Sequence, residues 1–200
     1  MFLALDLPLK ITALIEKIIW RIKNSSNFSA GAGDVRWVES EAVHLTLKFL
    51  GNVKKCDLAK LETALRPLCA QHSPFNLALD QVGFFPSARR PRVVWIGLKG
   101  DLGRLSELHG MVDDCCGSLG FEKERRSFLP HITIGRVKHI KGRKYSENFI
   151  EGLSDFANII NTTDFGPFEI EELSLYSSEL KKTGAVHTKL RTFPFDGNAG

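Results

Sequence analysis

Two short segments of this sequence repeat one pattern, in which a histidine and a threonine alternate with aliphatic residues. The first is His44-Leu45-Thr46-Leu47 and the second is His131-Ile132-Thr133-Ile134. A period of two is typical of a half-buried β-strand, on which successive side chains point to opposite faces. The histidine and threonine of each segment are therefore expected on one face, and the aliphatic residues on the other.

Two such strands facing each other would bring together two histidines and two threonine hydroxyls. Histidine is the side chain whose ordinary pKa lies near neutrality, so one imidazole can act as a base while the other acts as an acid. A threonine hydroxyl can hold an anionic oxygen without adding charge. Because phosphoryl transfer depends mainly on positioning and charge stabilisation, these groups favour metal-free attack on a phosphodiester.

The repetition of the pattern is what favours a functional interpretation. The sequence holds six histidines and nine threonines, so a single His-x-Thr match has about a one-in-four chance of arising at random. One match is explained by a strand histidine whose ring caps a nearby carbonyl. Two matches, each on a predicted strand, favour a two-histidine site. Surface or structural roles are expected for His72, His109, His139 and His187.

Competing chemistries find little support in the sequence. There is no His-x-His or HExxH motif and no carboxylate inside either repeat, and threonine is a poor zinc ligand. No nucleophile-elbow motif supports a serine or cysteine nucleophile. We therefore expect neither a metal nor a cofactor. Reduced thiols without CxxC spacing are expected at Cys56, Cys69, Cys115 and Cys116.

Length and composition are those of an ordinary globular protein. The 200 residues are 43% hydrophobic and 25% charged, which suits one domain over residues 1–200. No apolar run reaches the length of a membrane span. The segment Met1–Asp6 is typical of a first strand rather than a signal peptide, so a cytoplasmic location is expected.

The net charge of +4 is compatible with an anionic partner without requiring one. The basic residues gather in three loops, where they either bind such a partner or simply face solvent. They are Arg89, Arg90 and Arg92, then Arg125 and Arg126, then Lys138, Lys141, Arg143 and Lys144.

Helical and strand patterns alternate along the chain. Apolar residues at helical spacing predict helices over about 8–22, 57–69 and 102–119. Strands are predicted over about 2–6, 35–38, 43–50, 75–82, 93–98, 129–137, 168–177 and 185–192, with part loop and part helix over 141–161. This mixture favours an α+β fold with two antiparallel sheets around a shared cleft and helices outside. A weak internal echo suggests two pseudo-symmetric lobes, one per His-x-Thr motif.

Together, these segments resemble the two-histidine (2H) phosphoesterase superfamily, and within it the RNA 2′,3′-cyclic phosphodiesterases, also called 2′-5′ RNA ligases. The resemblance covers almost the whole chain, and the paired motifs are its most specific part. The segments that carry it are Phe2–Leu5, Val35–Val38, His44–Gly51, Phe85–Pro86, Arg90–Trp95, Phe128–Val137 and Leu173–Ser178.

The resemblance implies a bilobal pseudo-twofold fold whose motifs face each other across a central cleft. It further implies metal-independent hydrolysis of RNA 2′,3′-cyclic phosphate ends to 2′-phosphate ends. In this reaction His44 would be the proton donor and His131 the proton acceptor, while Thr46 and Thr133 would hold the non-bridging oxygens. The reverse reaction with a 5′-hydroxyl RNA end would form a 2′-5′ linkage.

The roles of residues near the motifs are less determined. Arg136 is a candidate phosphate ligand. Strict alternation puts it opposite His131, so it reaches the cleft only if the strand bends near Gly135; otherwise a surface salt bridge is expected. Phe49 has the same parity problem and is a candidate core residue. His187 stands where the family more often shows an aromatic residue, and a non-catalytic role is expected for it.

Two alternatives to this function remain open. A related enzyme of the same fold could act on small cyclic nucleotides or on 2′-5′ oligonucleotides. A non-catalytic RNA-binding module would bind through the basic loops with steep salt dependence. In each case a monomer is expected, and some cleft aromatic residue would stack on a base.

Overall fold

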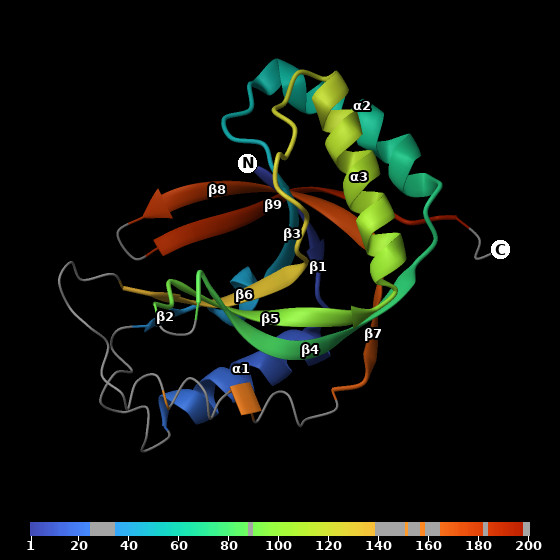
Figure 1. The fold of residues 1–200 in the computed structure, drawn as a ribbon. Helices are drawn as coiled ribbons and strands as arrows, with labels where there is room; N and C mark the ends of the chain where they lie inside the picture. The colour runs from blue at the N-terminus through green and yellow to red at the C-terminus, as the bar shows by residue number, and fades with distance from the viewer. Residues whose placement is uncertain are drawn as a thin grey trace.

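The structure is a computed structural model that describes residues 1–24, 35–87, 90–138, 151, 157–158, 165–181 and 184–197 (Figure 1). The helices are α1 (Leu9–Lys23), α2 (Lys55–Ala70) and α3 (Leu102–Ser118), with a short 3-10 turn η2 (Ser40–Ala42). The strands are β1 (Phe2–Asp6), β2 (Val35–Trp37), β3 (His44–Phe49), β4 (Phe75–Phe85), β5 (Val93–Gly100), β6 (His131–Val137), β7 (Pro167–Ile170), β8 (Glu172–Lys181) and β9 (Gly184–Pro194). Most of the segment 141–161, and His139, lie outside the described residues.

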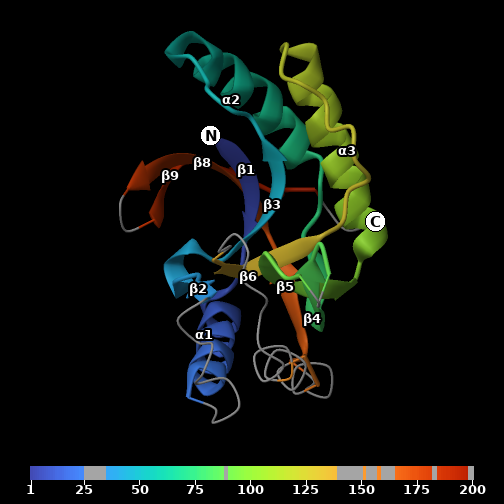
Figure 2. The ribbon, with the colours of Figure 1, turned by 60° about the vertical axis from the view of Figure 1, so that its left-hand side comes forward.

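The described strands form one curled antiparallel sheet of nine strands, so the α+β class is confirmed (Figure 2). Its order is β7-β4-β5-β6-β3-β1-β8-β9, with β2 paired to β6. The two sheets expected from the sequence are joined at their centre by a single antiparallel pair, Leu45 opposite Ile132. Both side chains are fully buried. Among the described residues, the strand pairing that joins the two half-sheets is therefore one apolar pair between the two His-x-Thr strands.

The two half-sheets repeat one ladder. In the β1–β3 ladder Asp6 lies opposite His44, and in the β5–β6 ladder Gly97 lies opposite His131. Each ladder then shifts register after the threonine, because β3 and β6 each hold one extra residue, Leu47 and Ile134. Such a β-bulge changes which face the following residues occupy.

Helices cover the half-sheets on the sides away from the cleft. Helices α2 and α3 lie side by side against β3 and β9, whereas α1 contacts η2 and lies below β2 (Figures 1 and 2). The predicted apolar stripe of α1 is confirmed, since Ile11, Ile15, Ile18 and Ile19 are all buried. No described helix is long and apolar enough to cross a membrane.

Several strand boundaries differ from the expected ones. The single strand predicted over 168–177 is wrong, because the chain leaves the ladder at Glu171 and forms two strands, β7 paired with β4 and β8 paired with β1. Strand β4 continues to Phe85, three residues beyond the predicted end, because its ladder with β5 absorbs an irregularity between Leu79 and Val82 and then resumes. Strand β6 begins at His131, two residues later than expected.

The β4–β5 ladder makes room for a large ring beside the second histidine motif. Gly83 lies opposite Trp95, and a Cβ atom built on Gly83 would overlap the Trp95 indole. The same ring also contacts the position where a Cβ of Gly97 would lie, at 3.3 Å. Two glycines thus let the indole lie flat across the sheet near His131.

We expect Gly83→Ala to lower the free energy of unfolding by about 1–3 kcal/mol, because the added methyl displaces the packed indole. Chemical denaturation measures this. Gly103→Ala is the matched control: Gly103 is exposed on α3 with nothing within 4 Å of a built Cβ, so an unchanged or slightly higher stability is expected. Equal stability of both variants would contradict the packing role.

Candidate functional site

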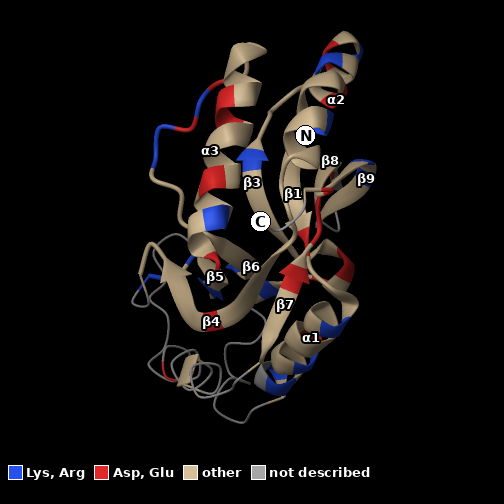
Figure 3. Cartoon of the chain, turned by 90° about the vertical axis from the view of Figure 1, so that its right-hand side faces the viewer, with Lys and Arg blue, Asp and Glu red and all other residues tan. Residues whose placement is uncertain are grey.

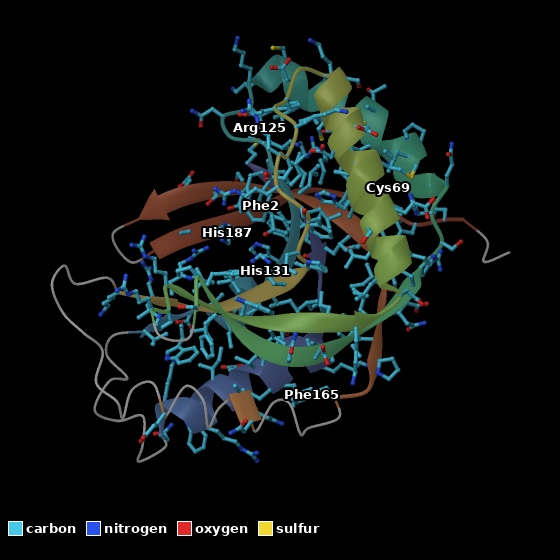
Figure 4. The ribbon with its side chains drawn as sticks, viewed as in Figure 1. Phe2, Cys69, Arg125, His131, Phe165 and His187 are labelled. Carbon is cyan, nitrogen blue, oxygen red and sulfur yellow. The ribbon has the colours of Figure 1, made fainter. Side chains whose placement is uncertain are left out.

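The two half-sheets enclose a cleft of about 2640 Å³ lined by residues from both of them. All five residues singled out in the sequence line it: His44, Thr46, His131, Thr133 and Arg136. Figure 4 shows His187 of β9 and His131 of β6 near each other, with Phe2 close to His187 at the level of the β8–β9 hairpin. The tertiary structure therefore brings the two motifs to one site.

The two histidines are held in the same way. His44 Nδ1 lies 2.8 Å from the carbonyl oxygen of Ala42, and His131 Nδ1 lies 2.8 Å from that of Leu129. Because a carbonyl only accepts hydrogen bonds, each Nδ1 carries the proton and donates it. In both rings Nε2 is left as the nitrogen that can gain or lose a proton.

The His44 ring is packed among other rings. Phe2 stacks on it with centroids 4.8 Å apart, and the Tyr176 ring lies 5.2 Å from Phe2 and 6.1 Å from His44, nearly parallel to both. Burial in this stack lowers the pKa of His44 to about 4, against an ordinary 6.5. The carbonyl of Ala42 and the carboxylate of Asp6 act in the opposite direction but do not outweigh burial. The free protein therefore holds His44 neutral at pH 7.

Asp6 is a fixed negative charge beside the His44 half of the cleft. It accepts hydrogen bonds from Ser174 Oγ at 2.6 Å, from the Tyr176 hydroxyl and from Lys189 Nζ at 2.7 Å. Burial would raise the pKa of Asp6, but these donors, Lys189 foremost, hold it below its ordinary value. Asp6 is thus ionised at neutral pH and stabilises an imidazolium at His44 when one forms.

His131 has a different environment. The ring of Phe85 meets it edge-on with centroids 5.1 Å apart, and Trp95 does so at 6.2 Å. Its ladder partner is Gly97, at the position where Asp6 stands in the other ladder. The two histidines therefore share one backbone frame and differ in the charges near them.

Arg136 lies on the same face as His131 because of the bulge in β6. Thr133 pairs with Trp95 and Gly135 with Val94, so Ile134 is the extra residue and reverses the parity beyond it. Gly135 is buried and Arg136 is exposed in the cleft. The bend near Gly135 that the sequence analysis required is present, and Arg136 is available to an anion.

Phe49 occupies the equivalent position in β3, and its expected core role is wrong. The extra residue Leu47 turns Lys48 toward α3, where its ammonium binds Asp113 and the carbonyl of Glu122, at 2.8 Å from that oxygen. Phe49 then points into the cleft and is 71% exposed. Strict alternation failed here for the same reason as at Arg136.

Two cleft residues were missed by the sequence analysis. His187, for which a surface or structural role was expected, lines the cleft with its ring edge-on to His44 at 5.3 Å. Arg36 lies directly opposite Arg136 across the β2–β6 ladder and also lines the cleft. The signals for Arg36 were its place between two apolar strand residues, Val35 and Trp37, and within the segment Val35–Val38 that carries part of the family resemblance.

Among the described residues, no three His, Cys, Asp or Glu side chains lie close enough together to hold a metal ion. The four cysteines are free thiols. Burial raises the pKa of Cys69 and of Cys116 to about 12, so these two are unreactive at neutral pH.

Several known proteins are similar to this chain. The sequence model of the 2′-5′ RNA ligase superfamily matches residues 15–182. The RNA 2′,3′-cyclic phosphodiesterase of Methanocaldococcus jannaschii is 35% identical over 96% of this chain and 98% of its own length.

Solved structures share the fold. The protein TT0787 of Thermus thermophilus superposes with a TM-score of 0.76 at 24% identity, covering 99% of this chain and 98% of that one. Escherichia coli LigT complexed with 3′-AMP superposes with a TM-score of 0.68 at 26% identity, covering 97% and 96%.

We expect the His44 ring to titrate in the free protein near pH 4, because burial favours its neutral form. Inorganic phosphate should move this titration upward, since a nearby anion favours the imidazolium. Proton–carbon NMR of the ring Cε1–H measures both, with His44→Gln identifying the signal. A midpoint near 6.5 that phosphate leaves unmoved would contradict this account of the cleft.

Proposed function

This chain belongs to the 2′-5′ RNA ligase superfamily, and from that premise we propose that it hydrolyses RNA 2′,3′-cyclic phosphate ends to 2′-phosphate ends. One observation carries the proposal: two matched strands present two histidines with free Nε2 atoms to one cleft, each fixed by a 2.8 Å contact of Nδ1 with a carbonyl. The relative from Methanocaldococcus jannaschii named for this activity supports it.

In the proposed reaction His131 is the proton acceptor and His44 the proton donor. His131 Nε2 takes a proton from the attacking water as the water oxygen bonds to phosphorus. The bond between phosphorus and the 3′ oxygen breaks, and His44 Nε2 gives its proton to that oxygen. A 2′-phosphate and a 3′-hydroxyl result, without a metal.

His44 has to gain its proton before it can act as the donor. The pKa of about 4 in the free protein leaves it neutral at pH 7. The cyclic phosphate carries one negative charge, which favours the imidazolium, and Asp6 favours the same form. Substrate binding therefore raises the pKa of His44, so that His44 becomes protonated in the enzyme–substrate complex and not in the free protein.

The remaining cleft groups bind the phosphate. Thr46 and Thr133, two residues after each histidine, donate hydrogen bonds to the non-bridging oxygens. Arg136 supplies a guanidinium on the same face as His131 and Thr133. Donors placed where charge develops in the transition state accelerate the chemical step rather than binding alone.

The same geometry accommodates ligation. When a 5′-hydroxyl RNA end takes the place of the attacking water, His131 removes its proton as the 5′ oxygen bonds to phosphorus, the bond between phosphorus and the 3′ oxygen breaks, and His44 protonates that 3′ oxygen. The product is a 2′-5′ linkage. Hydrolysis is favoured in water because water is in large excess over RNA ends.

The cleft rim favours RNA over a small cyclic nucleotide. Arginines at the rim offer contacts for phosphates beyond the reacting one, and Phe49 offers an exposed ring for a base. Figure 3 shows acidic and basic residues alternating along the loop that follows α3. The arginines that line the cleft are Arg36, Arg90, Arg92, Arg125, Arg126 and Arg136.

The proposal also covers the state of the protein. The halves share one continuous sheet, so we take the chain to work as a single domain of two pseudo-symmetric lobes with one motif in each. We further propose that it acts as a monomer in the cytoplasm, where its four free thiols stay reduced.

Replacement of either histidine tests the chemistry. His44→Ala and His131→Ala should each lower kcat for a cyclic-phosphate-ended oligonucleotide by about 10²–10⁴-fold, since each removes one proton transfer. His72→Ala, outside the cleft lining, is the control and should retain full activity. Product analysis of an end-labelled RNA should give a 2′-phosphate, with rates unchanged by EDTA. A 3′-phosphate product would reverse the leaving group and refute the assigned roles.

The length of the substrate distinguishes an RNA partner from a small cyclic nucleotide. We expect kcat/KM for a cyclic-phosphate-ended oligonucleotide to exceed that for a nucleoside 2′,3′-cyclic phosphate by about tenfold or more, and to fall with salt. Phe49→Ala should lower kcat/KM for the oligonucleotide by about tenfold, because base stacking is lost. Leu9→Ala, a surface change on α1, should leave it unchanged. A mononucleotide turned over as efficiently as the oligonucleotide would favour the small-nucleotide alternative.

A further inference from the structure

A third histidine lies in the cleft beside His44. His187 is on β9, opposite Ser178 of β8, in the hairpin that extends over the His44 half of the cleft (Figure 4). Its ring meets His44 edge-on with centroids 5.3 Å apart and meets Phe2 edge-on at 4.9 Å. These two contacts fix the plane of the ring, so its nitrogens point in defined directions.

One nitrogen of this ring has no partner. His187 Nδ1 is buried and forms no hydrogen bond with any described residue. An unpaired N–H costs more to bury than an unpaired acceptor, so a neutral ring places its proton on Nε2. Because His187 lines the cleft, this tautomer offers an N–H donor to whatever occupies it.

The ring stays neutral because of its surroundings. Burial, and after it the Arg136 guanidinium, lower the pKa of His187 below its ordinary value. A neutral donor can bind an anionic oxygen without adding charge next to His44. It therefore does not oppose the protonation of His44 when substrate arrives.

Two cationic groups, Arg36 and Arg136, lie near this site. Arg36 and Arg136 stand directly opposite one another in the β2–β6 ladder, an arrangement of like charges that is unfavourable by itself. Neither of them forms an ion pair with a carboxylate in the part of the chain that the structure describes. An anion bound between these guanidiniums and His187 would relieve the repulsion.

We propose that His187, together with Arg136, binds a non-bridging oxygen of the substrate phosphate on the His44 side of the cleft. This inference rests on the proposed phosphodiesterase function and adds His187 to the residues that bind the phosphate. Arg136 comes from β6 and His187 from β9, so the phosphate would join the two half-sheets. Among the described residues the His131 half has no counterpart, because β7, the other outer strand, has only four residues and pairs with β4 at Phe75 to Ala78.

Two variants of His187 separate the donor from the ring. His187→Phe keeps a ring for packing against His44 and Phe2 but removes the donor. His187→Gln keeps an N–H donor on a side chain of similar reach. Thr188→Val is the matched control, since it removes a hydroxyl from the neighbouring residue of β9, which does not line the cleft.

Binding of inorganic phosphate is measured by NMR or calorimetry for all four proteins, alongside KM and kcat for the cyclic-phosphate oligonucleotide. We expect His187→Phe to weaken phosphate binding and to raise KM by about tenfold, the value of one lost hydrogen bond to a charged group. His187→Gln should recover most of the loss, and Thr188→Val should match the unaltered protein. Thermal unfolding confirms that each variant is folded.

The outcomes separate this proposal from the function it rests on. Wild-type phosphate affinity in His187→Phe overturns the subsite, whatever the enzyme hydrolyses. Weakened binding that His187→Gln fails to restore also overturns it and leaves His187 as a packing ring. If the unaltered protein binds phosphate but does not hydrolyse the RNA, the proposed function fails while the phosphate measurement still decides the role of His187.

Discussion

The site depends on one apolar contact, the antiparallel pair formed by Leu45 and Ile132. This pair is the sole ladder connection between the two half-sheets within the described residues, and both side chains are fully buried. An antiparallel pair has a local twofold relation at its centre, so the residues flanking it are placed symmetrically. His44 and Thr46 flank Leu45, while His131 and Thr133 flank Ile132. Burial of the two aliphatic side chains thus turns all four polar groups to the opposite, cleft side.

The two bulges lie at equivalent positions in the two strands, but the residues that they turn toward the cleft differ. Each of these strands has one extra residue directly after the threonine, and the second residue after that extra one points to the cleft face. On β3 this residue is Phe49, and on β6 it is Arg136. One half therefore offers a ring to a base, whereas the other offers a guanidinium to a phosphate. The same kind of β-bulge, present once in β3 and once in β6, therefore supplies a base contact in one half and a phosphate contact in the other.

The two histidines differ in their surroundings rather than in their backbone. Both rings are held by the same hydrogen bond to a carbonyl two residues earlier. His44 lies in an aromatic stack near an ionised Asp6, with His187 against its edge. His131 faces Phe85 and Trp95 and has Gly97 in place of the carboxylate. Charge and burial therefore distinguish two positions that the ladders make equivalent, whereas the proposed roles of His44 as acid and His131 as base come from the resemblance to the 2H phosphoesterases.

The sequence by itself determined the strand character of the two motifs, the faces of their histidines and threonines, and the helices whose apolar stripes are buried. These features follow from periodicity, which is local. Only the tertiary structure decided that Phe49 and Arg136 face the cleft, because a bulge changes parity and depends on the partner strand. It also decided that His187 and Arg36 join the site, since β9 and β2 reach it from distant parts of the chain. Local periodicity specifies which face a residue takes, whereas the neighbours across that face are set by strand pairing.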